Sequence, residues 1–261
     1  MNMEGVEGVS APPPRFTLTP IQTLKEDILF CVDGDAESQV EMKIATGASG
    51  RPLTRLDAIK QAILMFVNAK TTIDPNHRFA FCAIGKSVSW VRKEFNNDVD
   101  SALSALRSIS VNPTGGLADL THLFRVAAHE AKKSRAQNRL FRVILFYCRS
   151  SSPPHHQWPA SQKLFTLDVV YLHDKPGPEN CPQKVYDALV DALEHVSEYE
   201  AFIFESGQGL PRVLFRQVST LLAHPQQRCV QDDLDIPKSL ARKTPPADAM
   251  TGAEVIPVPS Q

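Results

Sequence analysis

The feature that most constrains the fold of this 261-residue chain is the segment 27–38. Five consecutive apolar residues, 28–32, are followed at once by the acids Asp33, Asp35 and Glu37. A continuous apolar run that stops at polar residues is typical of a strand buried on both faces. Open α/β sheets bind their ligands beyond the carboxyl ends of such strands. The sequence therefore predicts a buried strand with an acidic loop at the ligand-binding edge of a sheet.

Beyond this segment, short apolar runs alternate with segments whose apolar residues recur at helical spacing. Strands are expected over 27–32, 79–84, 88–91, 142–147, 166–172 and 201–204. Helices are expected after the capping box Thr54-x-x-Asp57 and over 98–109, 120–131, 185–196 and 211–222. Strands that alternate with helices form βαβ units, in which helices cover both faces of a parallel sheet. The predicted fold is α/β, with a doubly wound, mostly parallel sheet flanked by helices.

The two ends of the chain differ in composition from its middle. Residues 1–20 include Pro12-Pro13-Pro14, which favours an extended backbone, and are predicted to be a flexible arm. Residues 21–230 carry the strand and helix patterns and are predicted to form one domain. Acids, prolines and small residues dominate 231–261, so we predict a flexible partner-binding tail there.

Charge and cysteine content exclude several classes of protein. The net charge of −1 gives no global attraction to nucleic acid or to anionic membranes. No apolar run reaches the roughly 18 residues of a transmembrane helix. The basic stretch 132–142 is interpreted as the solvated end of a helix rather than as a nucleic-acid contact. We therefore expect no direct nucleic-acid contact and no membrane insertion. Cys31, Cys82 and Cys148 lie in apolar runs, which predicts buried thiols in a reducing compartment: the cytoplasm, the nucleus or both.

The predicted order of elements resembles the von Willebrand factor A fold over 26–222. Members of that family hold Mg²⁺ with an Asp-x-Ser-x-Ser loop, a Gly-Gly-Thr loop and an Asp after a later strand. The corresponding loops here read Asp33-Gly34-Asp35-Ala36-Glu37, Gly115-Gly116-Leu117 and Tyr147-Cys148-Arg149. Acids replace both serines, Leu117 replaces the threonine, and Arg149 brings a cation. Because Mg²⁺ requires several oxygens from different loops, we predict a degenerate metal-ion-dependent adhesion site, no metal and no cofactor.

A more specific resemblance lies in the segment Leu221-Leu222-Ala223-His224-Pro225-Gln226-Gln227-Arg228. It is similar to a Leu-Leu-Ala-His-Pro-x-Gln-Arg segment of the MERIT-forty family of scaffold subunits. Those subunits serve the BRISC deubiquitinase and its nuclear DNA-repair counterpart, the breast-cancer-susceptibility-one A complex. The strand segments 143–147 and 168–173 and the proline-rich arm also fit this family.

The resemblance implies a non-catalytic scaffold or adaptor that supports assembly and the cleavage of non-degradative polyubiquitin chains by a zinc isopeptidase subunit. The implied direct partner is the ubiquitin-conjugating-enzyme-like subunit of BRISC. Through it the chain would reach the zinc isopeptidase and its Abraxas-type scaffold, with polyubiquitin contacted only indirectly. The implied localisation is the cytoplasm and the nucleus.

Two other functions remain open from the residues. Asp33, Asp35 and Glu37 are compatible with a metal-dependent von Willebrand A-type protein-binding module outside the ubiquitin system. A hydrolase is the third possibility, but no catalytic residues are predicted. The adjacent His155-His156 are poorly placed to ligate one tetrahedral Zn²⁺ ion from a rigid element.

Partner contacts are predicted at the C-terminal end of the chain. Pro225 and Arg228 begin the exit from the last helix, and the core is expected to end near Leu222. The predicted docking residues in the tail are Val255, Ile256 and Pro257. Apolar residues on an extended, proline-bearing segment bind with a reduced entropy loss, because prolines pre-set the backbone.

Overall fold

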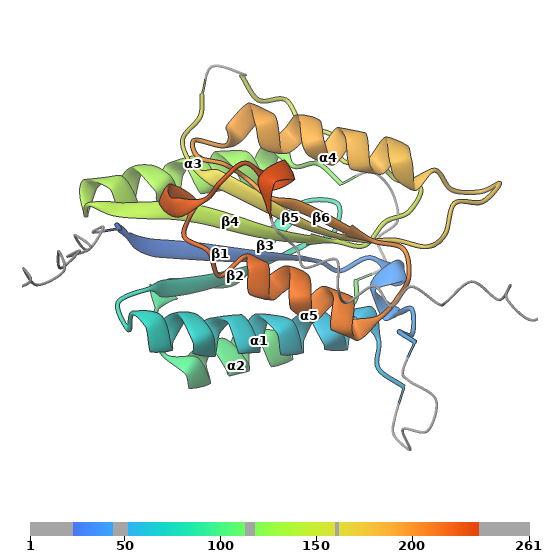
Figure 1. Cartoon of the computed structure of the whole chain (residues 1–261), viewed down its shortest axis with the longest axis horizontal. Coiled ribbons are helices and arrows are strands. Elements are labelled where there is room, and N and C mark those ends of the chain that lie inside the picture. The colour runs from blue at the N-terminus through green and yellow to red at the C-terminus, as the bar shows by residue number, and fades with distance from the viewer. Residues whose placement is uncertain (1–22, 44–51, 113–117, 160–161, 235–261) are drawn as a thin grey trace, which may run out of the picture.

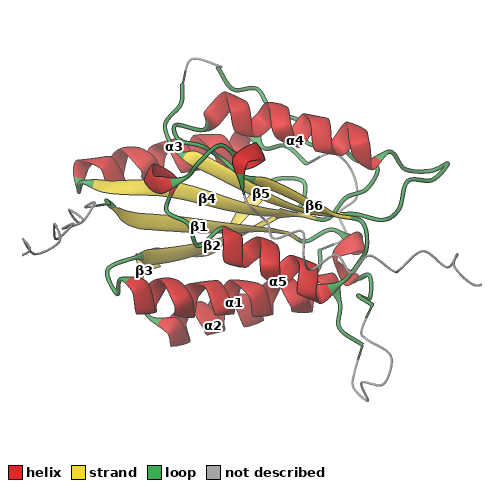
Figure 2. Ribbon diagram, viewed as in Figure 1, coloured by secondary structure: helices red, strands yellow, loops and turns green. Residues whose placement is uncertain are grey.

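The computed structural model describes residues 23–43, 52–112, 118–159 and 162–234, which form one sheet with helices on both faces (Figures 1 and 2). The strands are β1 (Lys25–Asp33), β2 (Arg78–Ile84), β3 (Val88–Asn96), β4 (Arg139–Tyr147), β5 (Thr166–Leu172) and β6 (Ile203–Ser206). The α-helices are α1 (Arg55–Ile73), α2 (Val99–Ser108), α3 (Thr121–Ala136), α4 (Pro182–Val196) and α5 (Pro211–Thr220). Short 3₁₀ turns are η1 (Ala36–Gln39), η2 (Pro225–Gln227) and η3 (Gln231–Asp233).

The strands lie in the order β3-β2-β1-β4-β5-β6. All neighbouring pairs are parallel except β2 and β3, which form an antiparallel pair at one edge. The prediction of a doubly wound, mostly parallel sheet is confirmed. The predicted strand 88–91 was too short, since β3 continues to Asn96. Its second half has side chains that are partly buried or exposed, so it lacks the apolar signal that marks the inner strands.

The central strand β1 separates two cores. Ile28, Phe30 and Val32 pack toward α1, α2 and α5, whereas Leu29 and Cys31 pack toward α3 and α4. Figure 1 shows these two helix layers on opposite sides of the sheet. Alternate residues of a strand point to opposite faces, so a strand covered on both faces must be apolar throughout. This explains the unbroken apolar run at 28–32.

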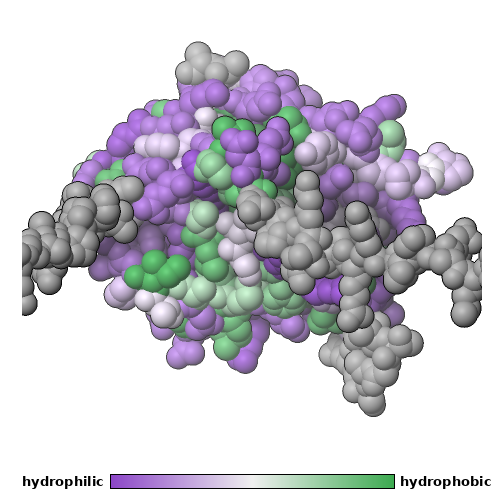
Figure 3. Space-filling view, viewed as in Figure 1, coloured by the Kyte–Doolittle hydropathy of each residue, from purple (hydrophilic) through white to green (hydrophobic). Residues whose placement is uncertain are grey.

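Predictions from short sequence patterns are also confirmed. The side chains of Thr54 and Asp57 form the reciprocal capping box that was predicted for the start of α1. Cys31, Cys82 and Cys148 are buried, as expected from their positions in apolar runs. Among the described helices, none combines the length and the apolar character that a membrane crossing requires. The face seen in Figure 3 is mainly hydrophilic, with its apolar side chains in small groups.

Two interpretations from the sequence need correction. The basic stretch 132–142 is not simply the solvated end of a helix, because α3 ends at Ala136 and Arg142 lies fully buried in β4. The core does not end near Leu222, since Leu234 packs against the core on the α1 side. The predicted arm 1–20, Leu117, and the tail residues Val255, Ile256 and Pro257 lie outside the described residues.

Candidate functional site

The carboxyl ends of β1 and β4 bring the predicted acids together with the segment that follows β4. Asp33 ends β1, Asp35 accepts a hydrogen bond at the start of η1, and Glu37 lies within η1. Arg149 and Ser150 follow β4 and reach across to these acids. Because β1 and β4 are parallel neighbours, their carboxyl ends meet at one edge of the sheet. This edge is where the sequence predicted a ligand site.

Arg149 binds Asp33 through two parallel hydrogen bonds. Its Nε lies 3.0 Å from Oδ2 and its Nη2 lies 2.9 Å from Oδ1 of Asp33. The backbone N–H groups of Cys148 and Asp35 also donate to this carboxylate, each at 3.2 Å. Asp33 is fully buried and the Arg149 side chain is 4% exposed. Burial raises the pKa of Asp33, while Arg149 acts in the opposite direction by stabilising the carboxylate.

Glu37, a second acid of this edge, is also bound by the protein. Glu37 accepts hydrogen bonds from the backbone N–H of Ser150 at 2.9 and 3.0 Å, and from the Ser150 hydroxyl. Arg55, at the start of α1, lies 3.7 Å from the Glu37 carboxylate and pairs with Asp174 at 2.6 Å. Glu37 therefore ties the loop after β1 to the segment after β4.

These residues do not fit a Mg²⁺ ion. Octahedral Mg²⁺ needs carboxylate oxygens that are open to the ion and close to 2.1 Å from it. Here both oxygens of Asp33 accept hydrogen bonds from the protein, and the guanidinium of Arg149 places a positive charge against them. The sequence predicted that Arg149 would bring a cation near this position, and the structure bonds it directly to Asp33. We therefore derive no metal chemistry at this edge.

The opposite, amino end of the sheet holds a network of buried charges. Asp168 of β5 accepts from Arg142 Nε at 2.6 Å and from Arg228 Nη1 at 2.7 Å. Glu26 of β1 accepts from Arg142 Nη1 at 3.2 Å and pairs with Lys70 of α1. The side chains of all five residues are at most 2% exposed. Sequence reasoning missed this network because each charge lies far in sequence from its partners.

The segment that carried the specific resemblance is part of this amino end. His224 Nε2 donates to the backbone oxygen of Leu24 at 2.9 Å, and the Leu24 N–H donates to the Gln226 side chain at 3.0 Å. Arg142 Nη2 donates to the backbone oxygen of Leu221 at 2.7 Å. These bonds fasten the end of α5 and the following turn to the start of β1 and to β4, so the segment 221–228 acts as a clamp within the fold.

This clamp bears on two predicted docking residues. Pro225 is buried in η2, and the Arg228 side chain is fully buried against Asp168 and lies 4.3 Å from the ring centre of Phe202. Their role in partner binding stays a prediction. Burial within the fold disfavours it, because a buried side chain is not available to a partner. Sequence reasoning took the segment for an exit because His-Pro ends a helix. It had no signal for the buried acid that Arg228 meets.

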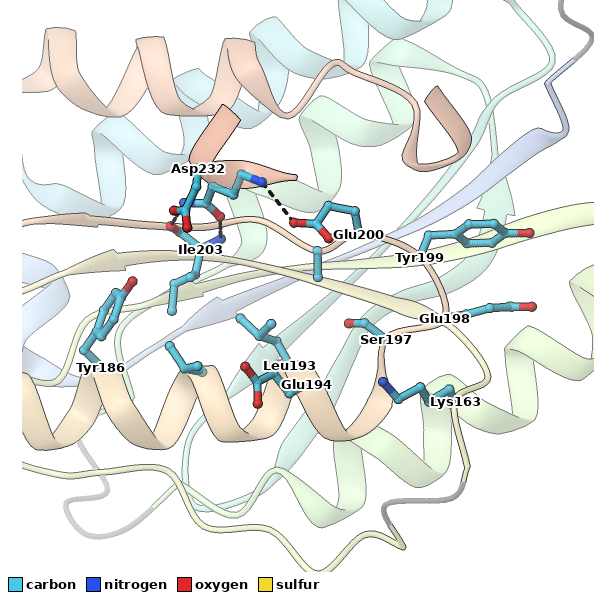
Figure 4. Close-up of a pocket in the computed structure, with 13 residues that line it drawn as sticks. Lys163, Tyr186, Leu193, Glu194, Ser197, Glu198, Tyr199, Glu200, Ile203 and Asp232 are labelled. Carbon is cyan, nitrogen blue, oxygen red and sulfur yellow. Dashed lines mark hydrogen bonds between the residues drawn. The ribbon is translucent and has the colours of Figure 1, made fainter. Parts of the chain in front are cut away.

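A groove of about 590 Å³ lies at the outer edge of the sheet, between α4 and β6 (Figure 4). Tyr186 and Leu193 of α4 face it from one side, and Ile203 and Asp232 line it from the other. The Gln231 side-chain amide bonds both the N–H and the carbonyl of Ile203, at 2.8 and 2.7 Å. The edge strand is thus covered there by a side chain, as exposed edges often are.

The fold and the carboxyl end of the sheet define a class of protein: a von Willebrand A-like domain in which Arg149 bonds to the acid that ends β1. Similar solved structures include the von Willebrand A domain of SpRpn10, with a TM-score of 0.50 and 18% identity over 74% of this chain and 94% of that one. The PilB minor pilin of Streptococcus sanguinis is similar with a TM-score of 0.51 and 10% identity, over 78% and 62% of the two chains. No model of a known protein family matches the sequence.

Similar characterised proteins include BRISC and BRCA1-A complex member 1 from two vertebrates. The Xenopus laevis protein is 26% identical over 239 residues, which cover 85% of this chain and 71% of that protein. The human protein is 24% identical over 246 residues, which cover 87% and 73% of the two chains. The resemblance drawn from the sequence is confirmed: the chain is similar to this complex member over most of its length. The name denotes a member of a complex and not an enzyme.

Proposed function

We propose that this chain is a non-catalytic scaffold subunit of a BRISC-type deubiquitinase complex and of its nuclear DNA-repair counterpart. The proposal is supported by similarity to BRISC and BRCA1-A complex member 1 along more than four-fifths of the chain. The structural observation that carries the non-catalytic part is the buried Arg149–Asp33 pair. It occupies the edge at which an α/β sheet of this class would otherwise bind a ligand.

As a scaffold, the chain has its direct partner in the ubiquitin-conjugating-enzyme-like subunit. Through that subunit it reaches the zinc isopeptidase and its Abraxas-type scaffold, and it meets polyubiquitin only indirectly. Its role is to support assembly of the complex and the cleavage of non-degradative polyubiquitin chains. We propose localisation to both the cytoplasm and the nucleus.

We place the partner at the amino end of the outer strand β6, beside the groove between α4 and β6. The described fold ends at Leu234, directly after the residues Gln231 and Asp232 that line the groove in Figure 4. A partner that takes up the tail 235–261 would therefore begin its contact beside this groove. Acids outnumber cations around the groove: Glu194, Glu200 and Asp232 line it with Lys163, while Glu198 pairs with Arg135. This excess would favour a partner surface with basic side chains.

The experiment is affinity purification of the tagged full-length chain from its source cells, with identification of the proteins that co-purify. The expected result is recovery of the ubiquitin-conjugating-enzyme-like subunit, the isopeptidase and the Abraxas-type scaffold. In parallel, the purified single chain is expected to leave polyubiquitin intact. Recovery of none of these subunits, or cleavage by the single chain that a zinc chelator blocks, would overturn the proposal.

A second experiment, in which the metal is removed with EDTA, distinguishes the proposed scaffold from a metal-dependent adhesion module. Because Arg149 supplies the charge that balances Asp33, capture of the ubiquitin-conjugating-enzyme-like subunit is expected to be equal in EDTA and in millimolar Mg²⁺. Capture that requires Mg²⁺ and is lost in Asp33→Ala would instead support the adhesion module.

A further inference from the structure

A second group of possible metal ligands lies away from the acids that end β1. It combines His156, in the segment that follows β4, with Asp191 and His195, which are one turn apart on α4. His156 Nε2 lies 3.0 Å from Asp191 Oδ2, and His195 Nδ1 lies 3.3 Å from Asp191 Oδ1. One ligand atom from each of the three residues falls within 4.8 Å of the others. This spacing suits side chains that converge on a single ion.

The ring of His195 is already oriented by the backbone of its own helix. Its Nδ1 lies 2.7 Å from the backbone oxygen of Asp191. A carbonyl oxygen only accepts, so Nδ1 carries the hydrogen and the lone pair that could bind an ion is on Nε2. The 3.3 Å approach of Nδ1 to Asp191 Oδ1 therefore brings the two side chains together but is not itself a ligand distance. Histidines that ligate metals are commonly held in this way, with one ring nitrogen donating to a backbone carbonyl.

The ring of His156 is held in place by packing. Its side chain is nine-tenths buried, with 10% exposed. It packs edge-on against Phe124 at 5.4 Å and lies 5.2 Å from the ring of His195. Its buried Nδ1 has no hydrogen-bond partner among the described residues. The other ring nitrogen, Nε2, lies 3.0 Å from Asp191 Oδ2 and is the one that would meet an ion.

The surroundings leave the group accessible from solution. Asp191 is 59% exposed and His195 is 30% exposed. They border a hollow of about 450 Å³ that Pro154 and Trp158 also line. An ion can therefore enter and keep a water molecule as a further ligand.

We propose that His156, Asp191 and His195 form a binding site for a divalent transition-metal ion, with Zn²⁺ as the metal that fits best. Two imidazoles and one carboxylate are a ligand set that Zn²⁺ accepts, with water completing a tetrahedron. Mg²⁺ and Ca²⁺ prefer oxygen ligands alone. The ion would fasten the segment between β4 and β5 to α4. The site was overlooked in the sequence because only His155-His156 was considered, whereas the partners of His156 lie on a helix 35 residues or more away.

The test is titration of the full-length chain with ZnCl₂ by calorimetry, in a buffer that does not chelate zinc. Because Cys181 and Cys229 are exposed thiols that also bind zinc, the chain carries Cys181→Ser and Cys229→Ser. One saturable site per chain is expected. Asp191→Asn and His156→Gln are each expected to weaken the dissociation constant at least tenfold. The matched control is His129→Gln, since His129 is exposed on α3, and it is expected to leave affinity unchanged.

Thermal melting supplies the second readout. Zinc is expected to raise the melting temperature of the background chain and of His129→Gln, but not that of Asp191→Asn, since a ligand stabilises the state that binds it. Asp191 is largely exposed, so Asp191→Asn is expected to melt like the background chain without zinc. Absence of a saturable site overturns the proposal. So does equal affinity in Asp191→Asn and the background chain, or loss of binding in His155→Gln alone.

Discussion

The two ends of the sheet use the same chemistry for different purposes. At the carboxyl end, one arginine–carboxylate pair, Arg149 with Asp33, closes the edge where sheets of this class bind ligands. At the amino end, Arg142 and Arg228 share Asp168 and so fasten the chain after α5 to the sheet. The comparison shows that the role of a buried ion pair depends on which segments it joins. One pair joins the end of β1 to the segment after β4, and the other joins the chain after α5 to the sheet.

The energetic consequences of the two arrangements also differ. Taking a charge out of water is costly, so a buried pair is weak evidence for net stabilisation. Removing one partner is damaging in either case, because the remaining charge stays buried. At the amino end an altered Asp168 would remove the carboxylate that two arginines share, although Arg142 keeps its contact with Glu26. At the carboxyl end an altered Asp33 would affect one arginine, which keeps its hydrogen bond to the backbone oxygen of Gly85 at 2.8 Å. The amino end is therefore expected to be the more sensitive.

The largest effect is expected for Asp168→Ala. This change leaves Arg142 and Arg228 without their shared carboxylate and should lower the free energy of unfolding by about 3–5 kcal/mol. Urea unfolding followed by circular dichroism measures it. Asp187→Asn, at an exposed position of α4, is the control and should stay within about 0.5 kcal/mol of the parent chain. A loss below 1 kcal/mol for Asp168→Ala would break the contrast between the two ends.

Asp33→Asn should cost less, about 1–3 kcal/mol of unfolding free energy. The asparagine keeps one oxygen acceptor, and Arg149 keeps its bond to Gly85. The same urea experiment compares the two variants directly. If Asp33→Asn proved more damaging than Asp168→Ala, the carboxyl end would be the one on which the fold depends.

Removing residues 235–261 separates folding from partner binding at the amino end. The cut falls after Leu234 because that side chain packs on the core. The melting temperature should stay nearly unchanged, while co-purification with the ubiquitin-conjugating-enzyme-like subunit should weaken at least tenfold, about 1.4 kcal/mol. The intact chain is the control. Full capture by the shortened chain would move the docking surface onto the folded domain.

Acid should act on the two ends with opposite signs. His77 lies directly before β2, at the amino end of the sheet, and is buried. Burial lowers its pKa to about 4, below the usual 6.5. Between these values only the unfolded chain takes up the proton, so stability falls as pH drops from 6.5 to 4. Burial raises the pKa of Asp168, but Arg142 and Arg228 outweigh it and lower that pKa from 3.8 to about 2. Stability therefore falls further as pH drops from 3.8 toward 2. The raised pKa of Asp33 works the other way, because the folded state then binds its proton first.

Urea unfolding at a series of pH values between 7 and 3 measures this dependence. His77 accepts a hydrogen bond from the Glu26 backbone N–H through Nδ1 at 3.0 Å, a bond that protonation of this nitrogen removes. His77→Gln should therefore flatten the fall between pH 6.5 and 4, whereas His129→Gln should leave it intact. Equal slopes in both variants would remove His77 from the explanation.

The smallest expected effect is that of Mg²⁺. Because the Asp33 carboxylate is bonded to Arg149 and to two backbone N–H groups, calorimetry with millimolar Mg²⁺ should give no saturable isotherm for the parent chain. Asp33→Ala should then behave identically in the titration. A saturable isotherm that Asp33→Ala abolishes would show that the carboxyl end still binds an ion.

Much of the architecture followed from local patterns. The apolar run 28–32 predicted a strand covered on both faces, and Thr54 with Asp57 predicted the start of α1. Such signals are readable because a strand or a helix imposes a fixed period on its own residues. The edge strand β3 was underestimated because its second half is only partly buried. The degenerate metal motif is likewise a prediction from local sequence, since the ligands of that motif occupy set positions.

The sequence by itself determined the fold class, the degenerate ligand motif and the resemblance to a complex subunit. Only the tertiary structure decided that Arg149 bonds to Asp33, that Arg228 is buried against Asp168, and that His156 meets α4. The physical reason is the distance along the sequence over which each interaction acts. Periodicity and capping act within a few residues, whereas a buried charge or a histidine takes its role from a partner that may be anywhere in the chain, and folding alone brings the two together.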